Sequence, residues 1–455
     1  MSKEHHHVEL GEPDIIRDVA APTTSTAEYR RVSIATMFGT TIEWYDYFIY
    51  ALIASIVFGK LFFSGLGEWN QLAALATVGV AFFFRPLGAV AMGPLGDKLG
   101  RRFVLVFTMV GMGAATALIG LLPTTQQIGV GAPILLILLR CLQGFAAGGQ
   151  WGGAAMLAVE HAPHGKRGWM GAYPQMGVPG GMVLASAVLL ILTNVMSPAA
   201  FLDWGWRLPF LFSIILIFAG NWVRNNVEDS PVFLELKEAK KNATSPLKEL
   251  MKTDGKRVLI GALTFMGTQA LGYMLVGGFI LGYANKVGGF SVPSILLWTM
   301  VASALWIVVT FAAAAWSDRK GRTFVYKVGY IAMALMCFPI FWLVKEGVEQ
   351  KNLTLVGLAL VLIAIPEGLT YGPQSAMFAE LFPVRVRLSG VSIAYALGAV
   401  LGGAFAPTIA EYLQKTYGTV VAVAPYLTIV ALISLTAVFF VKDKSQEPLH
   451  TMSGH

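Results

Sequence analysis

The sequence predicts an all-α integral membrane protein with twelve transmembrane helices in two pseudo-symmetric six-helix bundles. Three observations lead to this fold class. Of the 455 residues, 56% are hydrophobic and only 13% are charged, whereas soluble domains carry about 25% charged residues. The apolar residues form runs of about 20, the length that a helix needs to cross a bilayer. A charged turn also occurs twice, at corresponding places in two halves of the chain.

The repeated turn reads GDKLGRR at Gly96–Arg102 and SDRKGR at Ser317–Arg322, 221 positions later. A second pair of segments, Ala155–Glu160 and Ala376–Glu380, repeats at nearly the same offset. A large and constant offset indicates two copies of one unit in parallel orientation. We therefore expect six spans in each half.

The apolar runs place the spans in order along the chain. The first six are expected at about 33–59, 72–95, 103–122, 132–159, 168–193 and 206–224, and the last six at about 258–284, 294–316, 323–344, 353–379, 388–412 and 423–441. The domains are then a tail (1–32), a bundle (33–224), a polar linker (225–257), a second bundle (258–441) and a second tail (442–455).

Basic residues predict the orientation of the spans. With the N-terminus inside, 25 of the 33 Lys and Arg residues fall on the cytoplasmic side and six outside, while Arg85 and Arg140 lie inside spans. Cytoplasmic loops carry an excess of Lys and Arg, so both termini are expected in the cytoplasm. The same rule explains the net charge of +7 without a nucleic-acid partner.

The sequence lacks the motifs that are typical of nucleotide-binding proteins, of enzymes with a nucleophile and of metal-binding proteins. We find no nucleotide-binding loop, no nucleophile motif and no cluster of His and Cys with metal-ligand spacing. The two cysteines, Cys141 and Cys337, fall inside predicted spans, so a disulfide is not expected. We therefore expect no enzyme, no bound metal and no organic cofactor.

Ionisable residues inside spans mark functional sites, because each costs about 2.5–3.5 kcal/mol to insert at the helix centre. Glu43 lies ten residues into the first span, at a depth of roughly 15 Å. Asp46, Tyr47 and Tyr50 continue its face. A carboxylate in a medium of low polarity can carry a proton near neutral pH. We favour Asp46 as the proton carrier, with Glu43 as a second acid or as the partner of an arginine.

Two arginines are the expected partners of these acids. Arg140 begins a polar stripe on the fourth span that includes Gln143 and Gln150. The alternative to a functional role for Arg140 is a structural ion pair with Glu43 or Asp46. Arg85 precedes a helix-kinking proline, Pro86, in the second span. A guanidinium suits capture of a substrate carboxylate; the alternative for Arg85 is a gate pair.

The second half contributes a polar set of its own. Gln269 and Tyr273 share a face of the seventh span. Glu367, Tyr371 and Gln374 share a face of the tenth. With Arg85, Tyr47, Tyr50, Gln143 and Gln150, we expect them to bind substrate in a central cavity, the alternative being hydrogen bonds between helices.

The charged turns are expected to act as a gate. Glu160 and Glu380 end the fourth and tenth spans on the side of the turns. We expect Glu160 to meet Arg101 or Arg102, and Glu380 to meet Arg322, so that the cytoplasmic side closes. The full gating set is Asp97, Arg101, Arg102, Glu160, Asp318, Arg322 and Glu380.

Several motifs together resemble a known family. They are EWYDY at Glu43–Tyr47, FRPLG at Phe84–Gly88, the turn at Gly96–Arg102, RCLQG at Arg140–Gly144, GGQWGGA at Gly148–Ala154, and AELFP at Ala379–Pro383 with Arg385 and Arg387. The set resembles the metabolite:proton symporter branch of the major facilitator superfamily, whose members carry shikimate, 2-oxoglutarate, citrate or proline and betaine. The resemblance spans nearly the whole chain. It implies the major facilitator fold, and it implies a place for Arg140 in the proton-coupling motif.

One position departs from that branch, because Gln150 stands where its members usually have Glu. Since glutamine cannot carry a proton, this change removes one possible proton site and leaves the acids of the first span as the main candidates.

The expected function is proton-coupled uptake of a small organic acid, such as a shikimate-like or dicarboxylate metabolite, by alternating access. The alternative is uptake of a zwitterionic osmolyte such as betaine or proline. The proton is the expected coupling ion, and the expected partners are the substrate and the lipid bilayer. We expect a functional monomer in the inner (plasma) membrane.

Overall fold

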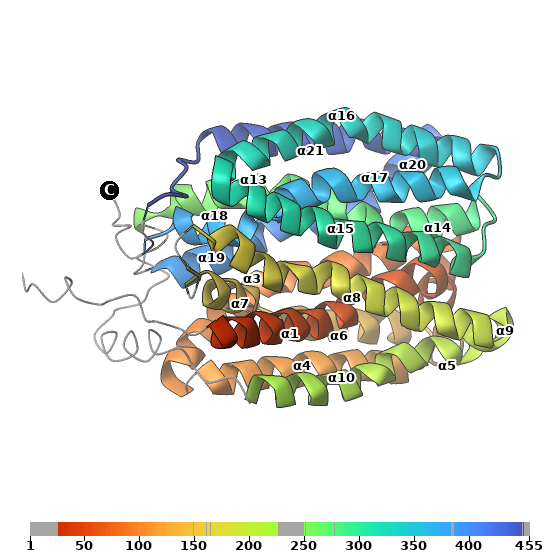
Figure 1. Cartoon of the computed structure of the whole chain (residues 1–455). Helices are drawn as coiled ribbons and strands as arrows, with labels where there is room; N and C mark the ends of the chain where they lie inside the picture. The colour runs from red at the N-terminus through yellow and green to blue at the C-terminus, as the bar shows by residue number, and fades with distance from the viewer. Residues whose placement is uncertain are drawn as a thin grey trace, which may run out of the picture.

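The computed structural model describes residues 26–99, 101–148, 150–160, 162–163, 165–225, 250, 252–276, 278–383, 386–447 and 449. Throughout these ranges the regular secondary structure is helical, and the long helices run roughly side by side (Figure 1). Most of the predicted tail 1–32 and linker 225–257, and the end of the tail 442–455, lie outside the described residues.

The first half begins with a long helix, α1 (Thr26–Ile53), which continues through η1 (Ala54–Phe58) into α2 (Gly59–Phe62). The other elements of this half are η2 (Ser64–Trp69), α3 (Asn70–Leu99), α4 (Arg101–Leu121), α5 (Thr125–Ile128), α6 (Gly131–Ala146), α7 (Gln150–Glu160), α8 (Arg167–Val195), α9 (Pro198–Asp203), η3 (Gly205–Arg207) and α10 (Leu208–Asn225).

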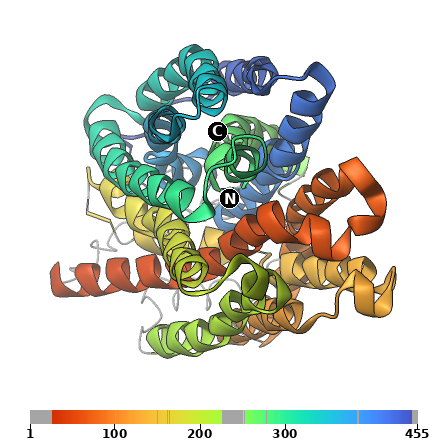
Figure 2. The same cartoon turned by 90° about the vertical axis from the view of Figure 1, so that its right-hand side faces the viewer.

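The second half follows after the linker. Its elements are α13 (Gly255–Val276), α14 (Phe279–Lys286), α15 (Val292–Lys320), α16 (Arg322–Glu349), α17 (Leu353–Tyr371), α18 (Gln374–Leu381), α19 (Arg387–Gly398), η6 (Ala399–Gly403), α20 (Ala406–Tyr417), η7 (Val420–Ala422) and α21 (Val423–Phe439). Figure 2 shows the two halves as neighbouring groups of helices.

The number of spans agrees with the predicted fold class. Within the described residues, ten helical stretches are long and apolar enough to cross a membrane. Two shorter apolar stretches, Val110–Leu121 and Gly205–Ile215, lie in the two expected spans that remain. The chain is therefore a multi-pass helical membrane protein.

Some spans are interrupted where the sequence predicted continuous helices. The seventh span divides into α13 and α14 beside Gly278, whose φ of 81° lies in the left-handed region that favours glycine. The tenth span divides into α17 and α18 at Gly372 and Pro373. Proline lacks the N–H that a continuous helix needs.

Small residues let helices of one half approach closely. A Cβ built on Gly144 of α6 would lie 1.9 Å from the carbonyl oxygen of Ala81 on α3, and one built on Gly88 of α3 would lie 2.0 Å from the carbonyl oxygen of Phe145. No side chain fits at either position. Gly88 and Gly144 therefore act in helix packing, where the absence of a side chain permits backbone contact.

Candidate functional site

Arg140 lies at the centre of a polar cluster inside the first half and is 0% exposed. Its Nε donates to the carbonyl oxygen of Thr77 at 3.1 Å, and Nη2 donates to that of Val78 at 2.9 Å. Its Nη1 donates to Gln143 Oε1. The guanidinium is thus held by α3 on one side and by its own helix, α6, on the other.

Gln143 extends this cluster toward the first span. Its Nε2 donates to Thr116 Oγ1 at 2.9 Å, and the same hydroxyl oxygen lies 3.5 Å from Asp46 Oδ2. Asp46 is 0% exposed, and its Oδ1 has no hydrogen-bond partner among the described residues. Arg140 therefore reaches Asp46 through Gln143 and Thr116. We call these four residues the relay.

Two tyrosines of α1 cover the arginine of the relay. The centre of the Arg140 guanidinium lies 3.8 Å from the centroid of the Tyr50 ring and 4.9 Å from that of Tyr47. Tyr47 Oη donates to the carbonyl oxygen of Val78 at 2.7 Å, and Tyr50 Oη lies 2.6 Å from Thr77 Oγ1. The ring faces offer the buried cation favourable electrostatics without supplying a formal charge.

Arg85 of α3 lies on the other side of Tyr47. The centre of its guanidinium is 5.0 Å from the Tyr47 ring, 5.1 Å from the Trp44 ring and 4.5 Å from the Phe82 ring. The side chain is 8% exposed. Glu43, one turn before Tyr47 on α1, is partly buried. The structure thus gathers predicted residues of the first, second and fourth spans in one polar region, and Thr116 of the third span, which was not predicted, joins them.

A small cavity lies between the two halves. Its lining combines residues of α1 and α8 with residues of the second half: Trp44, Phe48, Val178, Gln269, Gly272, Tyr273, Val276, Trp306, Glu367 and Tyr371. Four of the predicted binding residues, Gln269, Tyr273, Glu367 and Tyr371, are therefore brought together here. Arg85 reaches the same region through its contact with Trp44.

Gln175 joins the two halves beside this cavity, and the sequence did not single it out. Its Nε2 donates to Gln374 Oε1 and to the carbonyl oxygen of Tyr371, both at 3.1 Å. Its Oε1 accepts from Trp151 Nε1 at 2.9 Å. The Trp151 ring stacks on Tyr395 at 3.9 Å between centroids. Gln374 thus takes part in a contact between α18 and α8.

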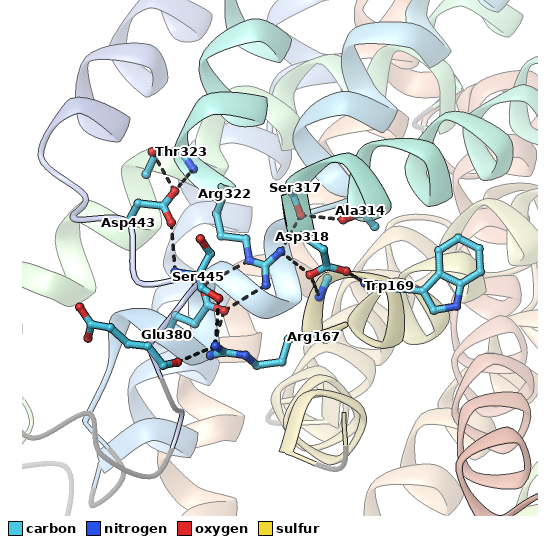
Figure 3. A network of polar contacts seen from close by, with 12 residues as sticks. Arg167, Trp169, Ala314, Ser317, Asp318, Arg322, Thr323, Glu380, Asp443 and Ser445 are labelled. Carbon is cyan, nitrogen blue, oxygen red and sulfur yellow. Dashed lines mark hydrogen bonds and ion pairs between the residues drawn. The ribbon is translucent and has the colours of Figure 1, made fainter. Parts of the chain in front are cut away.

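The end of the molecule that carries the repeated turns, here named the charged-turn end, holds a buried ionic network (Figure 3). Glu380 Oε1 lies 3.2 Å from Arg322 Nη2 and 3.1 Å from Arg167 Nη1. Arg322 Nη1 lies 2.6 Å from Asp318 Oδ1. Since Arg167 belongs to the first half and the other three to the second, the network joins the halves.

The Asp318 carboxylate also caps the N-terminus of α8. Its two carboxylate oxygens accept from the main-chain N–H groups of Gly168 at 2.8 Å and Trp169 at 2.9 Å. An anion is favourable at a helix N-terminus, where unpaired N–H groups and the helix dipole both attract it. A second link between the halves is the ion pair of Arg387 with Glu160, at 3.9 Å.

The C-terminal segment (Val441–Glu447 and Leu449) crosses this network. Arg167 Nη2 donates to the carbonyl oxygens of Ser445 at 3.0 Å and Glu447 at 2.6 Å. Asp443 accepts from the N–H groups of Thr323 at 2.9 Å and Ser445 at 3.0 Å. Burial by itself raises the pKa of Asp443, but the hydrogen bonds from Ser445 and Thr323 outweigh it and hold that pKa below its ordinary value.

The other end of the molecule also carries contacts between the halves. Gln71 Nε2 donates to the carbonyl oxygen of Ser55 at 2.9 Å, and Lys286 Nζ donates to Gln71 Oε1. Lys415 Nζ donates to the carbonyl oxygen of Glu68. The cavity therefore lies between two sets of contacts that join the halves.

Some predicted site residues cannot be placed. The side chains of Asp97, Arg101, Arg102 and Gln150 lie outside the described part of the structure. Sequence reasoning also overlooked Arg167, which forms an ion pair with Glu380 in the ionic network. Its place in the second repeat, opposite Arg387, was the signal that could have found it.

With this geometry in hand, we compared the chain with known proteins. The sequence profile of a family described as sugar (and other) transporter matches residues 32–256 and 235–453. The chain belongs to this family. It is thus a metabolite transporter of the major facilitator superfamily, and not an enzyme.

Relatives within the superfamily carry different substrates. The shikimate transporter of Escherichia coli (strain K12) is 36% identical over 430 residues, which cover 93% of this chain and 97% of that protein. The proline/betaine transporter of the same strain is 30% identical over 447 residues, covering 96% and 88%.

The fold of this chain is similar to that of the proton:xylose symporter XylE in a solved structure. The TM-score is 0.71 at 19% identity, and the match covers 93% of this chain and 98% of that one. The major facilitator fold predicted from the sequence is confirmed.

Proposed function

We propose that this chain imports a small organic acid together with one or more protons, and that Asp46 carries the proton. The observation that carries the proposal is the relay, a buried carboxylate joined to a buried arginine through Gln143 and Thr116. A proton on Asp46 removes one charge from this cluster. The hydrogen bonds of Thr116 and Gln143 then rearrange, and the field at Arg140 changes.

The proposed route of coupling passes from the relay to the cavity through aromatic rings. Tyr47 contacts both guanidinium groups, those of Arg140 and Arg85. Trp44 lies between Arg85 and the cavity that it lines. Arg85 is thus placed to attract a substrate carboxylate once the relay changes charge. A guanidinium binds a carboxylate through paired hydrogen bonds.

The charged-turn end is the proposed cytoplasmic gate. Its ionic contacts join the halves. The excess of basic residues on this side supports a cytoplasmic location for this end and for both termini. The proposed location is the inner (plasma) membrane. With the gate closed, substrate enters from outside; rocking of the two halves then exposes the cavity to the other side.

Uptake by proteoliposomes that contain the full chain tests this function. With an acidic exterior, we expect a radiolabelled acid such as shikimate to accumulate above its external concentration, and a protonophore to abolish the accumulation. One proton that moves down one pH unit supports an about tenfold gradient. Uptake that ignores the pH gradient would contradict proton coupling.

A zwitterionic osmolyte is the second candidate substrate, because the cavity holds a carboxylate, Glu367, among aromatic rings. Aromatic faces and a carboxylate suit an ammonium group. Accumulation of betaine or proline in the same assay, without accumulation of any acid, would select this alternative.

A further inference from the structure

Glu367 lines the cavity and keeps a carboxylate oxygen available for a ligand. It follows Pro366 in α17 and is 2% exposed. Its Oε2 has no hydrogen-bond partner among the described residues. A Cβ built on Gly272 would lie 2.6 Å from Oε1, so only glycine leaves room for the carboxylate on that side. The carboxylate is therefore held against α13 with one oxygen unused.

Other polar atoms of the cavity wall are unused as well. Tyr273 Oη, Tyr371 Oη, Gln269 Oε1 and Trp306 Nε1 are all buried and lack a hydrogen-bond partner in the described part of the chain. Buried polar groups are normally paired. Four such atoms around Glu367, in one cavity, indicate that a polar ligand completes them.

The charges around the cavity are unequally distributed. Among the described residues that line it, Glu367 is the one acidic side chain, and none is basic. The Arg85 guanidinium lies 5.1 Å from the centroid of the Trp44 ring, which lines the cavity. A substrate that spans the cavity therefore meets a cation at one end and an acid at the other.

We propose that Glu367 decides which acids this transporter accepts. The substrate carries one carboxylate, placed toward Arg85, and an electropositive group, hydroxyl or ammonium, placed against Glu367. A second carboxylate at that end would meet no basic residue in the described lining, and an unpaired charge is costly to bury. Dicarboxylates are thus excluded. This inference rests on the proposed uptake of organic acids and narrows it.

Binding to the purified full chain tests the inference without a pH gradient. The probes are shikimate, the same ring acid without hydroxyls, betaine, and the dicarboxylate 2-oxoglutarate, each measured by calorimetric titration. For the unmodified chain we expect shikimate or betaine to bind about tenfold or more tighter than the other two, since a site built for polar groups rejects analogues that leave them unpaired.

The variant Glu367→Gln replaces the carboxyl group by an amide and keeps the shape of the side chain. We expect it to lose most of that preference and to bind 2-oxoglutarate more tightly than the unmodified chain does. The control is Glu346→Gln, the same change at the far end of α16, which should keep the preference. Because Glu367 is buried, a melting temperature within a few degrees of the unmodified chain shows that the variant is folded.

Two results would overturn the inference. One is equal binding of shikimate and 2-oxoglutarate by the unmodified chain; the other is an unchanged preference in Glu367→Gln. Either result leaves proton-coupled uptake of acids intact. A chain that binds none of the four probes would refute both this inference and the uptake of such substrates, whereas failure of coupling alone would appear only in the uptake assay.

Discussion

At the scale of the residue, the first half separates a carboxylate from the nearest cation by two neutral side chains. Asp46 and Arg140 are both buried, yet Gln143 and Thr116 stand between them. A direct buried ion pair is costly to break, because each partner then lies unpaired in a medium of low polarity. The indirect link lets Asp46 change charge while Arg140 keeps its backbone partners.

The first prediction concerns Asp46→Asn. The amide keeps the shape but cannot carry a proton, so the about tenfold accumulation per pH unit that one symported proton supports should vanish. Exchange of labelled for unlabelled substrate across the proteoliposome membrane, which needs no net proton movement, should continue. The matched control is Asp203→Asn on α9, which is exposed and should leave accumulation unchanged. Accumulation by Asp46→Asn would refute its role as proton carrier.

The second prediction concerns Asp443 and pH. Since hydrogen bonds hold its pKa below the ordinary value, the ionised form stabilises the folded chain. This stability is fully present above the ordinary pKa of an aspartate and is lost as the pH falls through the lowered pKa. Asp443→Asn should cost about 1 kcal/mol or less, given partial exposure. The melting temperatures of the two proteins should differ equally at pH 8 and pH 6 and converge only near pH 4 or below.

At the scale of the element, helix contact in the first half depends on missing side chains. The α3–α6 pair meets at Gly88 and Gly144, where added Cβ atoms would overlap backbone carbonyl groups. In a bilayer, close packing replaces the hydrophobic effect as the force between helices. This packing also fixes Arg140, because its acceptors on α3 and its own helix are set by the same contact.

The third prediction is that Gly144→Ala destabilises the protein. Its methyl group would lie 1.9 Å from the Ala81 oxygen, so α6 must move away from α3. Overpacking typically costs about 1–3 kcal/mol, and we expect a lower melting temperature in detergent. The control is Gly153→Ala, since a Cβ there meets nothing within 4 Å. Equal melting temperatures for the two variants would contradict this account of the contact.

At the scale of the whole molecule, the two halves are joined at both ends and enclose a cavity between them. The charged-turn end uses buried ions, with Glu380 between Arg322 and Arg167. The opposite end uses lysine contacts, that of Lys286 with Gln71 and that of Lys415 with the carbonyl oxygen of Glu68. In the proposed alternating-access cycle, these ionic contacts exist in one arrangement of the halves and break in the other. They therefore bias the equilibrium between the two access states.

The fourth prediction is that Asp318→Asn shifts this equilibrium toward the state that is open at the charged-turn end. The variant weakens the contacts to Arg322 and to the N-terminus of α8. Spin labels on cysteines introduced at Lys166 and Lys320, with Cys141 replaced by Ser, should report a longer distance by double electron–electron resonance. Asp203→Asn, at the opposite end, should leave this distance unchanged. The substrate affinity of Asp318→Asn should equal that of the unmodified chain.

The sequence predicted the fold because its determinants are local. Apolar runs of spanning length and a charged turn at a constant offset are visible without coordinates. The same rules cannot show interruptions such as that at Gly278 or at Pro373, since glycine and proline occur in many continuous membrane helices as well. Only neighbouring helices decide which of them becomes a break.

For the candidate site, too, the sequence predicted one part and the tertiary structure decided the other. Asp46, Arg140 and Glu367 could be identified from the sequence. Inserting an ionisable side chain into a bilayer costs free energy wherever its helix lies. Partners depend on how helices rotate and cross. The tertiary structure alone decided that Arg140 is joined to Asp46 through two neutral side chains, that Arg167 meets Glu380, and that Glu367 faces a cavity without a basic residue in its described lining.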